Sequence, residues 1–179
     1  MGQYYKPCVM DRAKKAVVAS LHPHNFMNGA KLTEHSYVGN NLVNAAMRLI
    51  SVYKGKPFVW CGDYADERFV NKAGEKVNTY TLALMGDSLT PKEVSELGGE
   101  SNFKYIVNYT KREYVKVPEK VKNELVFHPL PLLTADGNQR GGGDYWGENS
   151  DLVGIWAYDR IGVTNKRPHY KRLEVSFSE

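Results

Sequence analysis

The stretch SYVGNNLVNAAMRLISVY, residues 36 to 53, decides the fold class of this chain. Its apolar side chains recur at spacings of three and four residues, at Val38, Leu42, Ala45, Ala46, Leu49, Ile50 and Tyr53. That spacing puts them on one face of an α-helix, so the sequence predicts a long amphipathic helix here.

Most of the remaining chain consists of short runs rich in aromatic and β-branched residues, which predict strands. The runs lie at residues 3–10, 15–22, 56–67, 78–87, 103–109, 113–117, 152–164 and 172–178. Residues 125–133 are expected to be extended, because two prolines interrupt them. Residues 90–97 predict a short helix, since Thr90 and Glu93 can form a capping box around Pro91.

Many strands, one long helix and no regular alternation of strand and helix predict an α+β fold. We expect one domain over residues 1–179, with a largely antiparallel sheet and one or two short helices. A chain of 179 residues is long enough to bury one well-packed core.

Composition and charge narrow the class of protein. The net charge is +4, but the basic residues are scattered, so nucleic-acid binding is not favoured. No apolar run is long enough for a membrane helix, and we expect a cytoplasmic protein without a membrane partner. The two cysteines, Cys8 and Cys61, lack metal-like spacing; they are expected as buried free thiols, with a disulfide as the alternative.

The strongest candidate for a binding site is the glycine block LLTADGNQRGGGDYWG, residues 132 to 147. Gly141, Gly142 and Gly143 can present successive backbone N–H groups to an anion, and Arg140 can add a bidentate grip. The other candidate ligand contacts in this block are Asp136, Asn138 and Asp144. The alternative is a wide surface turn or β-bulge.

Two known motifs nearly fit this block. A calcium-binding EF-hand loop starting at Asp136 would place the cation Arg140 at its fifth position and Gly147 where a bidentate Glu belongs. The Fic signature of AMP-transferring enzymes matches in DGNQR, but its His-Pro pair, at His128, lies four residues too far upstream. We therefore expect neither calcium binding nor Fic chemistry.

A second polar segment, LHPHNFMNGAKLTEHS at residues 21 to 36, carries three histidines and Lys31. His22 and His24 could face the same way, but no third ligand has convincing spacing, so no metal site or cofactor is expected. Histidines bonded to the loop backbone are the first interpretation, and acid–base use of His24 or His35 is the second.

Polar residues also interrupt two apolar runs that contain tryptophan. They are Asp63 and Asp66 after Trp60, and Asp159 and Arg160 after Trp156. Such positions can meet a ligand at a shared rim of a sheet. In the alternative interpretation the tryptophans pack in the core and Asp159 pairs with neighbours.

The segments MGQYYK, LHPHNFMNGAKLTEHS, LLTADGNQRGGGDYWG and LVGIWAYDRIGV resemble a family of small, uncharacterised bacterial, phage and fungal proteins. In that family the blocks MGQYY, LHPH with a following KLxE, LLADGNGRGGGD and GSWAGDRI recur in this order. The chain departs from the pattern at Gln139 and Tyr158, where the family has glycine, and residues 52–125 look like an insertion. The family brings no established activity. The resemblance implies only that residues 22–35, 136–144 and 156–160 form one site.

These observations lead to three functional hypotheses. The first is a protein that binds a small anionic ligand, such as a nucleotide, at Gly141–Gly143, with Lys31, Trp156 and Arg160 also contacting the ligand. The second is a protein-interaction module, such as a bacterial or phage immunity or counter-defence protein, that uses exposed aromatics at Tyr145 and Trp146. The third is a hydrolase or transferase in which His24 or His35 acts with Asp159.

Overall fold

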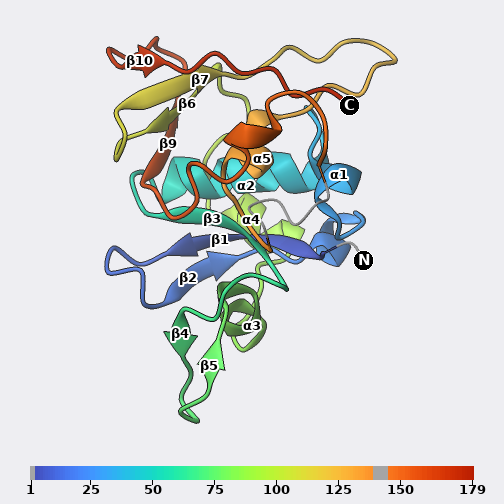
Figure 1. The fold of residues 1–179 in the computed structure, drawn as a ribbon. Coiled ribbons are helices and arrows are strands. Elements are labelled where there is room, and N and C mark those ends of the chain that lie inside the picture. Colours follow the sequence, from blue (N-terminus) through green and yellow to red (C-terminus); the bar gives the residue numbers. More distant parts are fainter. Residues whose placement is uncertain (1–2, 139–144) are drawn as a thin grey trace.

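A four-stranded sheet with the order β2-β1-β3-β8 forms one half of the fold, in the computed structural model that describes residues 3–138 and 145–179 (Figure 1). Its strands are β1 (Tyr5–Met10), β2 (Val17–Ser20), β3 (Phe58–Gly62) and β8 (Ala135–Asp136). The strands pair antiparallel except for β3 with β8, which are parallel. Every residue of β1 and of β3 is buried, so both faces of this sheet are covered.

A second four-stranded sheet with the order β10-β7-β6-β9 forms the other half. Its strands are β6 (Tyr105–Asn108), β7 (Glu113–Lys116), β9 (Ile161–Thr164) and β10 (Lys171–Arg172). Only the short pairing of β10 with β7 is parallel within this sheet. A separate hairpin of β4 (Phe69–Val70) and β5 (Lys76–Val77) projects beyond the first sheet (Figure 1).

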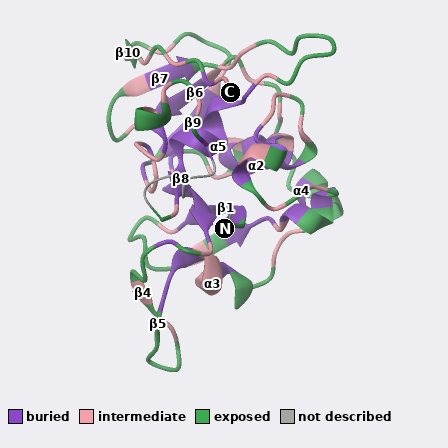
Figure 2. Ribbon diagram, turned by 45° about the vertical axis from the view of Figure 1, so that its right-hand side comes forward, coloured by how far each residue is buried: buried purple, intermediate pink, exposed green. Residues whose placement is uncertain are grey.

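The long helix α2 (Asn41–Val52) lies between the two sheets (Figure 1). Its apolar face belongs to one continuous core that takes Tyr5 and Trp60 from the first sheet and Ile106 and Ile161 from the second. Figure 2 shows this buried interior running from one sheet through to the other. The amphipathic helix expected from the spacing of its apolar residues is therefore confirmed, and it joins the sheets into one domain.

The remaining helices are short. They are α1 (Leu32–His35), α3 (Thr79–Leu84), α4 (Pro91–Glu96) and α5 (Pro129–Leu133), with 3-10 turns η1 (Pro23–Phe26) and η2 (Ser150–Leu152). The second face of the first sheet is covered by α3, where Ala83 packs against Cys8 and Cys61. The two cysteines are free and buried, with their Sγ atoms 3.2 Å apart.

The α+β class is confirmed, but several expected elements are wrong. Residues 79–84 form a helix rather than a strand, and residues 129–133 form a helix rather than an extended segment. A strand was expected over residues 152–164, but only Ile161–Thr164 form one, as β9. Residues 152–158 form turns instead. The described part of the chain has four short α-helices where one or two were expected.

Compared with the resembled family, residues 52–125 look like an insertion. In the structure this segment contributes β3 and the β6–β7 pair. Because β3 lies at the centre of the first sheet, this segment carries part of the core.

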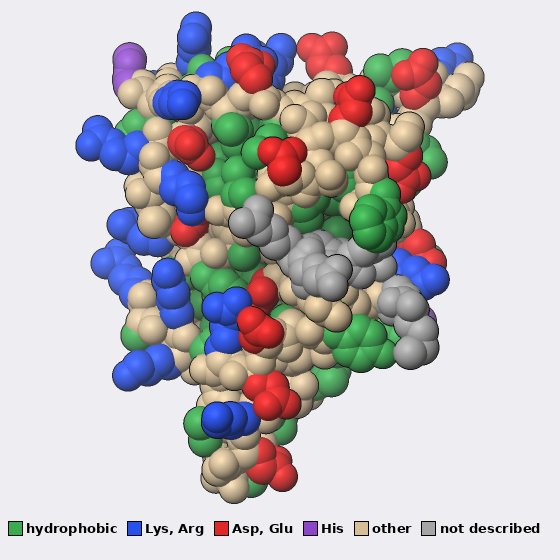
Figure 3. Space-filling view, in the orientation of Figure 1, with side chains coloured by type: hydrophobic (Ala, Val, Ile, Leu, Met, Phe, Trp, Pro, Cys, Tyr) green, Lys and Arg blue, Asp and Glu red, His purple; other side chains and the backbone are tan. Residues whose placement is uncertain are grey.

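Charge is distributed unevenly over the surface. Figure 3 shows Lys and Arg side chains gathered along one edge, over the β1–β2 and β6–β7 turns, while acidic side chains spread across the rest of this face. Among the described residues, no helix is long and apolar enough to cross a membrane.

Candidate functional site

The segment 156–160 is held between β3 and α5 by backbone hydrogen bonds. The N–H of Tyr158 donates to the carbonyl of Phe58 at 2.9 Å, and the N–H of Phe58 donates to Asp159 at 3.0 Å. Trp156 donates its N–H to Leu133 at 2.8 Å. Tyr158 adopts a φ of 65°, in the left-handed region that favours glycine.

This backbone geometry brings Tyr158 to the end of β8, where it contacts Asp136. The Tyr158 hydroxyl donates to Asp136 Oδ2 at 2.7 Å and lies 2.5 Å from Thr79 Oγ1. Burial, followed by the nearby Asp136 charge, raises the pKa of Tyr158. The phenol therefore stays protonated, and it remains a hydrogen-bond donor to the carboxylate.

The same group of residues lines a cavity of about 350 Å³, which we call the Asp136 cavity. Its described lining residues are Asp66, Arg68, Ala135, Asp136, Gly137, Asn138, Gly154, Ala157 and Tyr158. This volume lies at the lower end of the range of about 300–1,000 Å³ that is usual for small-ligand sites.

Arg68 is the cation among the described residues that line the Asp136 cavity. Its Nη2 atom lies 3.5 Å from Asp136 and 4.0 Å from Asp66, and its guanidinium lies 5.4 Å from the centre of the Tyr158 ring. The side chain is 49% exposed, and both ion-pair contacts are long. A ligand anion can therefore reach this guanidinium.

The glycine block is only partly described by the structure. Asp136 is buried in the network above, and the N–H of Asn138 donates to the side chain of Gln3 at 3.0 Å. Arg140, Gly141–Gly143 and Asp144 lie outside the described residues.

Three other candidate ligand contacts lie away from the Asp136 cavity. Trp156 is fully buried and donates its indole N–H to Glu113 at 3.1 Å. This agrees with the alternative expectation from the sequence, in which the tryptophans pack in the core. Arg160 donates from Nε to the carbonyl of Gly55 at 2.9 Å. Lys31 is exposed at the start of α1, where its N–H donates to Glu34.

His35 is a core residue on the opposite face of the first sheet from Asp136. Its Nε2 accepts the indole N–H of Trp60 at 2.9 Å, and its Nδ1 lies 2.9 Å from the carbonyl of Gly29. Trp60 pairs with Ala135 across β3 and β8, and alternation along β8 points Asp136 to the other face. Burial lowers the pKa of His35 to about 4, and both ring nitrogens are engaged within the fold.

The other two candidates for acid–base chemistry are also separated. Asp159 accepts a hydrogen bond from Asn108 Nδ2 at 2.8 Å and pairs with Lys111 at the end of the second sheet. His24 is exposed on η1, where its N–H donates to the ring of His22. Neither histidine contacts Asp159 in the described structure. No group of three or more His, Cys, Asp or Glu among the described residues is placed to hold a metal ion.

The sequence did not single out Arg68 or Thr79 as parts of a site, and it included Tyr158 only within the block 156–160 that the resemblance implies. Arg68 lies in an ordinary polar turn after β3, and Thr79 lies in a segment that resembles a strand. Tyr158 stood out only because the resembled family has glycine there. Its positive φ shows a physical reason for glycine at this position.

A comparison of the chain with protein-family models, with curated proteins and with solved structures finds no match of any of the three kinds. The resemblance to the uncharacterised family therefore stays an expectation from the sequence.

Proposed function

We propose that this protein binds a small anionic ligand, a nucleotide or another phosphate-containing compound, in the Asp136 cavity. The observation that carries the proposal is the half-exposed guanidinium of Arg68 at the cavity wall. A guanidinium can donate two parallel hydrogen bonds to a phosphate. Asp136, fixed by Tyr158, can accept a hydrogen bond from a ligand hydroxyl.

The glycine block belongs to the same proposal, because residues 139–144 directly follow Asn138 in the cavity wall. The backbone N–H groups of Gly141–Gly143 and the side chain of Arg140 would add donors for the phosphate. Asp144 would orient the loop or a ligand hydroxyl.

The test is isothermal titration of the whole protein with AMP, ATP and inorganic phosphate. We expect Arg68→Ala to weaken binding of the nucleotide by about tenfold or more, since a hydrogen bond to a charged group contributes about 1.5–3 kcal/mol. Arg68→Lys keeps the charge but loses the bidentate geometry, so an intermediate affinity is expected.

Arg172→Ala is the matched control, because Arg172 is similarly exposed and pairs with Glu174 away from the cavity. It should leave the affinity unchanged. If none of the three probes binds, or if Arg68→Ala binds as well as the original protein, the proposal is wrong.

A protein-interaction module is the second candidate function, and Trp146 is the observation that favours it. This side chain, near the end of the glycine block, is 81% exposed, whereas the neighbouring Tyr145 is buried with its hydroxyl bonded to Ser178. Of the two aromatic residues that were expected to be exposed, only Trp146 is exposed. An absence of nucleotide binding, together with a purified partner whose binding is lost in Trp146→Ala, would favour this candidate over the first.

The hydrolase or transferase hypothesis is not carried further. It requires a histidine in contact with Asp159, and Asp159 instead contacts Asn108 and Lys111.

A further inference from the structure

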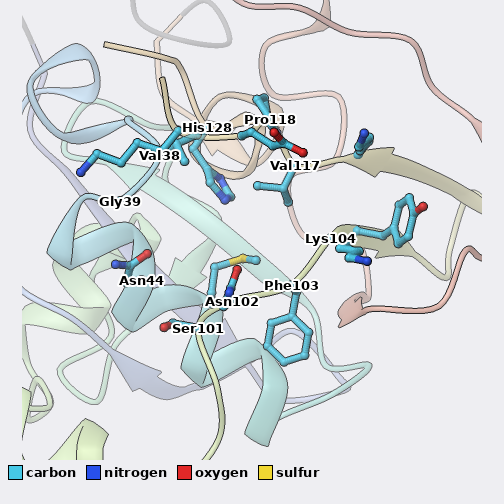
Figure 4. Close-up of a pocket in the computed structure, with 15 residues that line it drawn as sticks. Val38, Gly39, Asn44, Ser101, Asn102, Phe103, Lys104, Val117, Pro118 and His128 are labelled. Atoms are coloured by element: carbon cyan, nitrogen blue, oxygen red, sulfur yellow. The ribbon is translucent and has the colours of Figure 1, made fainter. Parts of the chain in front are cut away.

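A second cavity, of about 640 Å³, lies between α2 and the β6–β7 hairpin, and none of its described lining residues also lines the Asp136 cavity. We call it the His128 cavity. Figure 4 shows its walls, which come from Asn44 on α2, from Ser101 to Lys104 before β6, and from Val117 and Pro118 after β7. Its volume is in the middle of the range for small-ligand sites, about 300–1,000 Å³.

The rim of the His128 cavity is positively charged. Its lining includes Lys104, Lys116 and Lys120, with Glu119 as the one carboxylate among the described lining residues. None of the three lysines forms an ion pair with a described residue. The described lining therefore carries an excess of positive charge, which attracts an anion.

His128 supplies a buried polar group to the same space. The residue is 4% exposed, and its ring points toward the space between Asn102 and Val117 (Figure 4). Its Nδ1 accepts the N–H of Leu130 at 3.2 Å, which leaves the proton of the neutral ring on Nε2. Nε2 makes no hydrogen bond within the described residues, and it is not one of their fully buried unpaired atoms, so a ligand in the cavity can reach it.

The lining combines the polar side chains of Asn44, Ser101 and Asn102 with several apolar ones. Val38, Met47, Phe103, Val117 and Pro118 line the cavity between the lysines and the imidazole. A ligand that fits this lining has an apolar body as well as a charged group.

We propose that the His128 cavity binds a small organic anion, a carboxylate or phosphate ester with an apolar body. The lysines at the rim neutralise its charge, and the Nε2–H of His128 donates a hydrogen bond to one of its oxygens. The apolar body lies against Met47 and Phe103. This site is separate from the one proposed at Asp136.

The test is titration of the whole protein, followed by NMR, with phenyl phosphate and 3-phenylpropionate. Inorganic phosphate and the uncharged 3-phenylpropanol are the comparison probes. We expect saturable binding of one or both organic anions, and binding at least about tenfold weaker for the two comparison probes. Higher salt should weaken the binding, because the lysines are exposed.

The variant Lys104→Ala/Lys116→Ala/Lys120→Ala should lower the affinity by about tenfold or more. These lysines are exposed, so the variant is expected to fold. The control Lys72→Ala/Lys76→Ala/Lys92→Ala carries the same change of charge at exposed positions outside the cavity and should bind normally. His128→Phe should also weaken binding, because it keeps an aromatic ring at this position but removes the N–H donor.

Arg68→Ala separates this proposal from the proposed function, since it should weaken nucleotide binding and leave the affinity for the organic anions unchanged. The present proposal is overturned if neither organic anion binds saturably. It is also overturned if the triple lysine variant binds as tightly as its control.

Discussion

At the scale of single residues, the structure separates side chains that are neighbours in the sequence. Tyr158 points to the Asp136 cavity on one side, while the adjacent Asp159 points to Asn108 and Lys111 on the second sheet. Likewise His35, bonded to Trp60, and Asp136 lie on opposite faces of the first sheet. The residue types indicate that these side chains are polar and can take part in a site. They do not indicate which of the side chains contact one another.

Lys6 is a single residue with a measurable effect on stability. It is fully buried in β1, and its Nζ lies 4.4 Å from the centre of the Tyr80 ring without a hydrogen-bond partner among the described residues. Burial lowers the pKa of this amine. We expect Lys6→Met to raise the free energy of unfolding by about 1–3 kcal/mol, because it removes an unsatisfied buried polar group.

Urea denaturation measures this gain. It should shrink as the pH rises from the lowered pKa of the folded protein to the usual 10.5, because the folded amine is then neutral while the unfolded one still loses its proton. Lys92→Met, on an exposed surface, is the control and should change stability by less than about 0.5 kcal/mol. A less stable Lys6→Met protein would show that the amine makes a net favourable contact.

At the scale of elements, the sequence predicted α2 and α4 and missed α3 and α5. The α4 helix carries its signal locally: Glu93 accepts the N–H of Thr90 at 2.7 Å, and Thr90 accepts the N–H of Glu93 at 3.3 Å. The α3 helix is rich in β-branched and aromatic residues, and its start is fixed by Asn78, which also donates to the carbonyls of Asp63 and Ala65. No pattern in the local sequence indicates that Asn78 will bond to the turn at residues 63–65.

The α5 helix shows a different reason for a wrong prediction. Both of its prolines lie in the first turn, where an α-helix does not need their N–H groups. His128 caps this turn through its ring nitrogen. Proline disrupts a helix only in its interior, and the five-residue α5 helix is too short to have an interior.

The capping box of α4 gives a prediction for a single element. Thr90→Ala should lower the free energy of unfolding by about 1 kcal/mol, because the N–H of Glu93 loses its acceptor. Thr90→Ser keeps the hydroxyl and should retain most of this stability. Thermal or urea denaturation compares the two variants, and equal losses in both would mean that the cap contributes nothing.

At the scale of the whole molecule, two buried histidines link stability to pH. Burial lowers the pKa of His35 to about 4 and that of His128 to about 3. The unfolded chain takes up protons on these rings as the pH falls below about 6.5, whereas the folded protein does not. Stability is therefore full above pH 6.5, and each histidine should remove about 1.4 kcal/mol per pH unit below it.

Urea denaturation at pH 7, 6 and 5 measures this slope. His35→Gln and His128→Gln should each flatten it, whatever their effect on stability at pH 7. A stability that stays constant from pH 7 to pH 5 would contradict the burial of both rings.

The sequence by itself determined the α+β class, the long helix that joins the sheets, and the capped α4 helix. These features rest on periodicity and on contacts within a few residues, which local sequence encodes. Only the tertiary structure decided that Arg68, Thr79 and Tyr158 lie near Asp136, and that three separated lysines line the same cavity as His128. These residues meet because strands from distant parts of the chain pair and twist together, and no local pattern records that pairing.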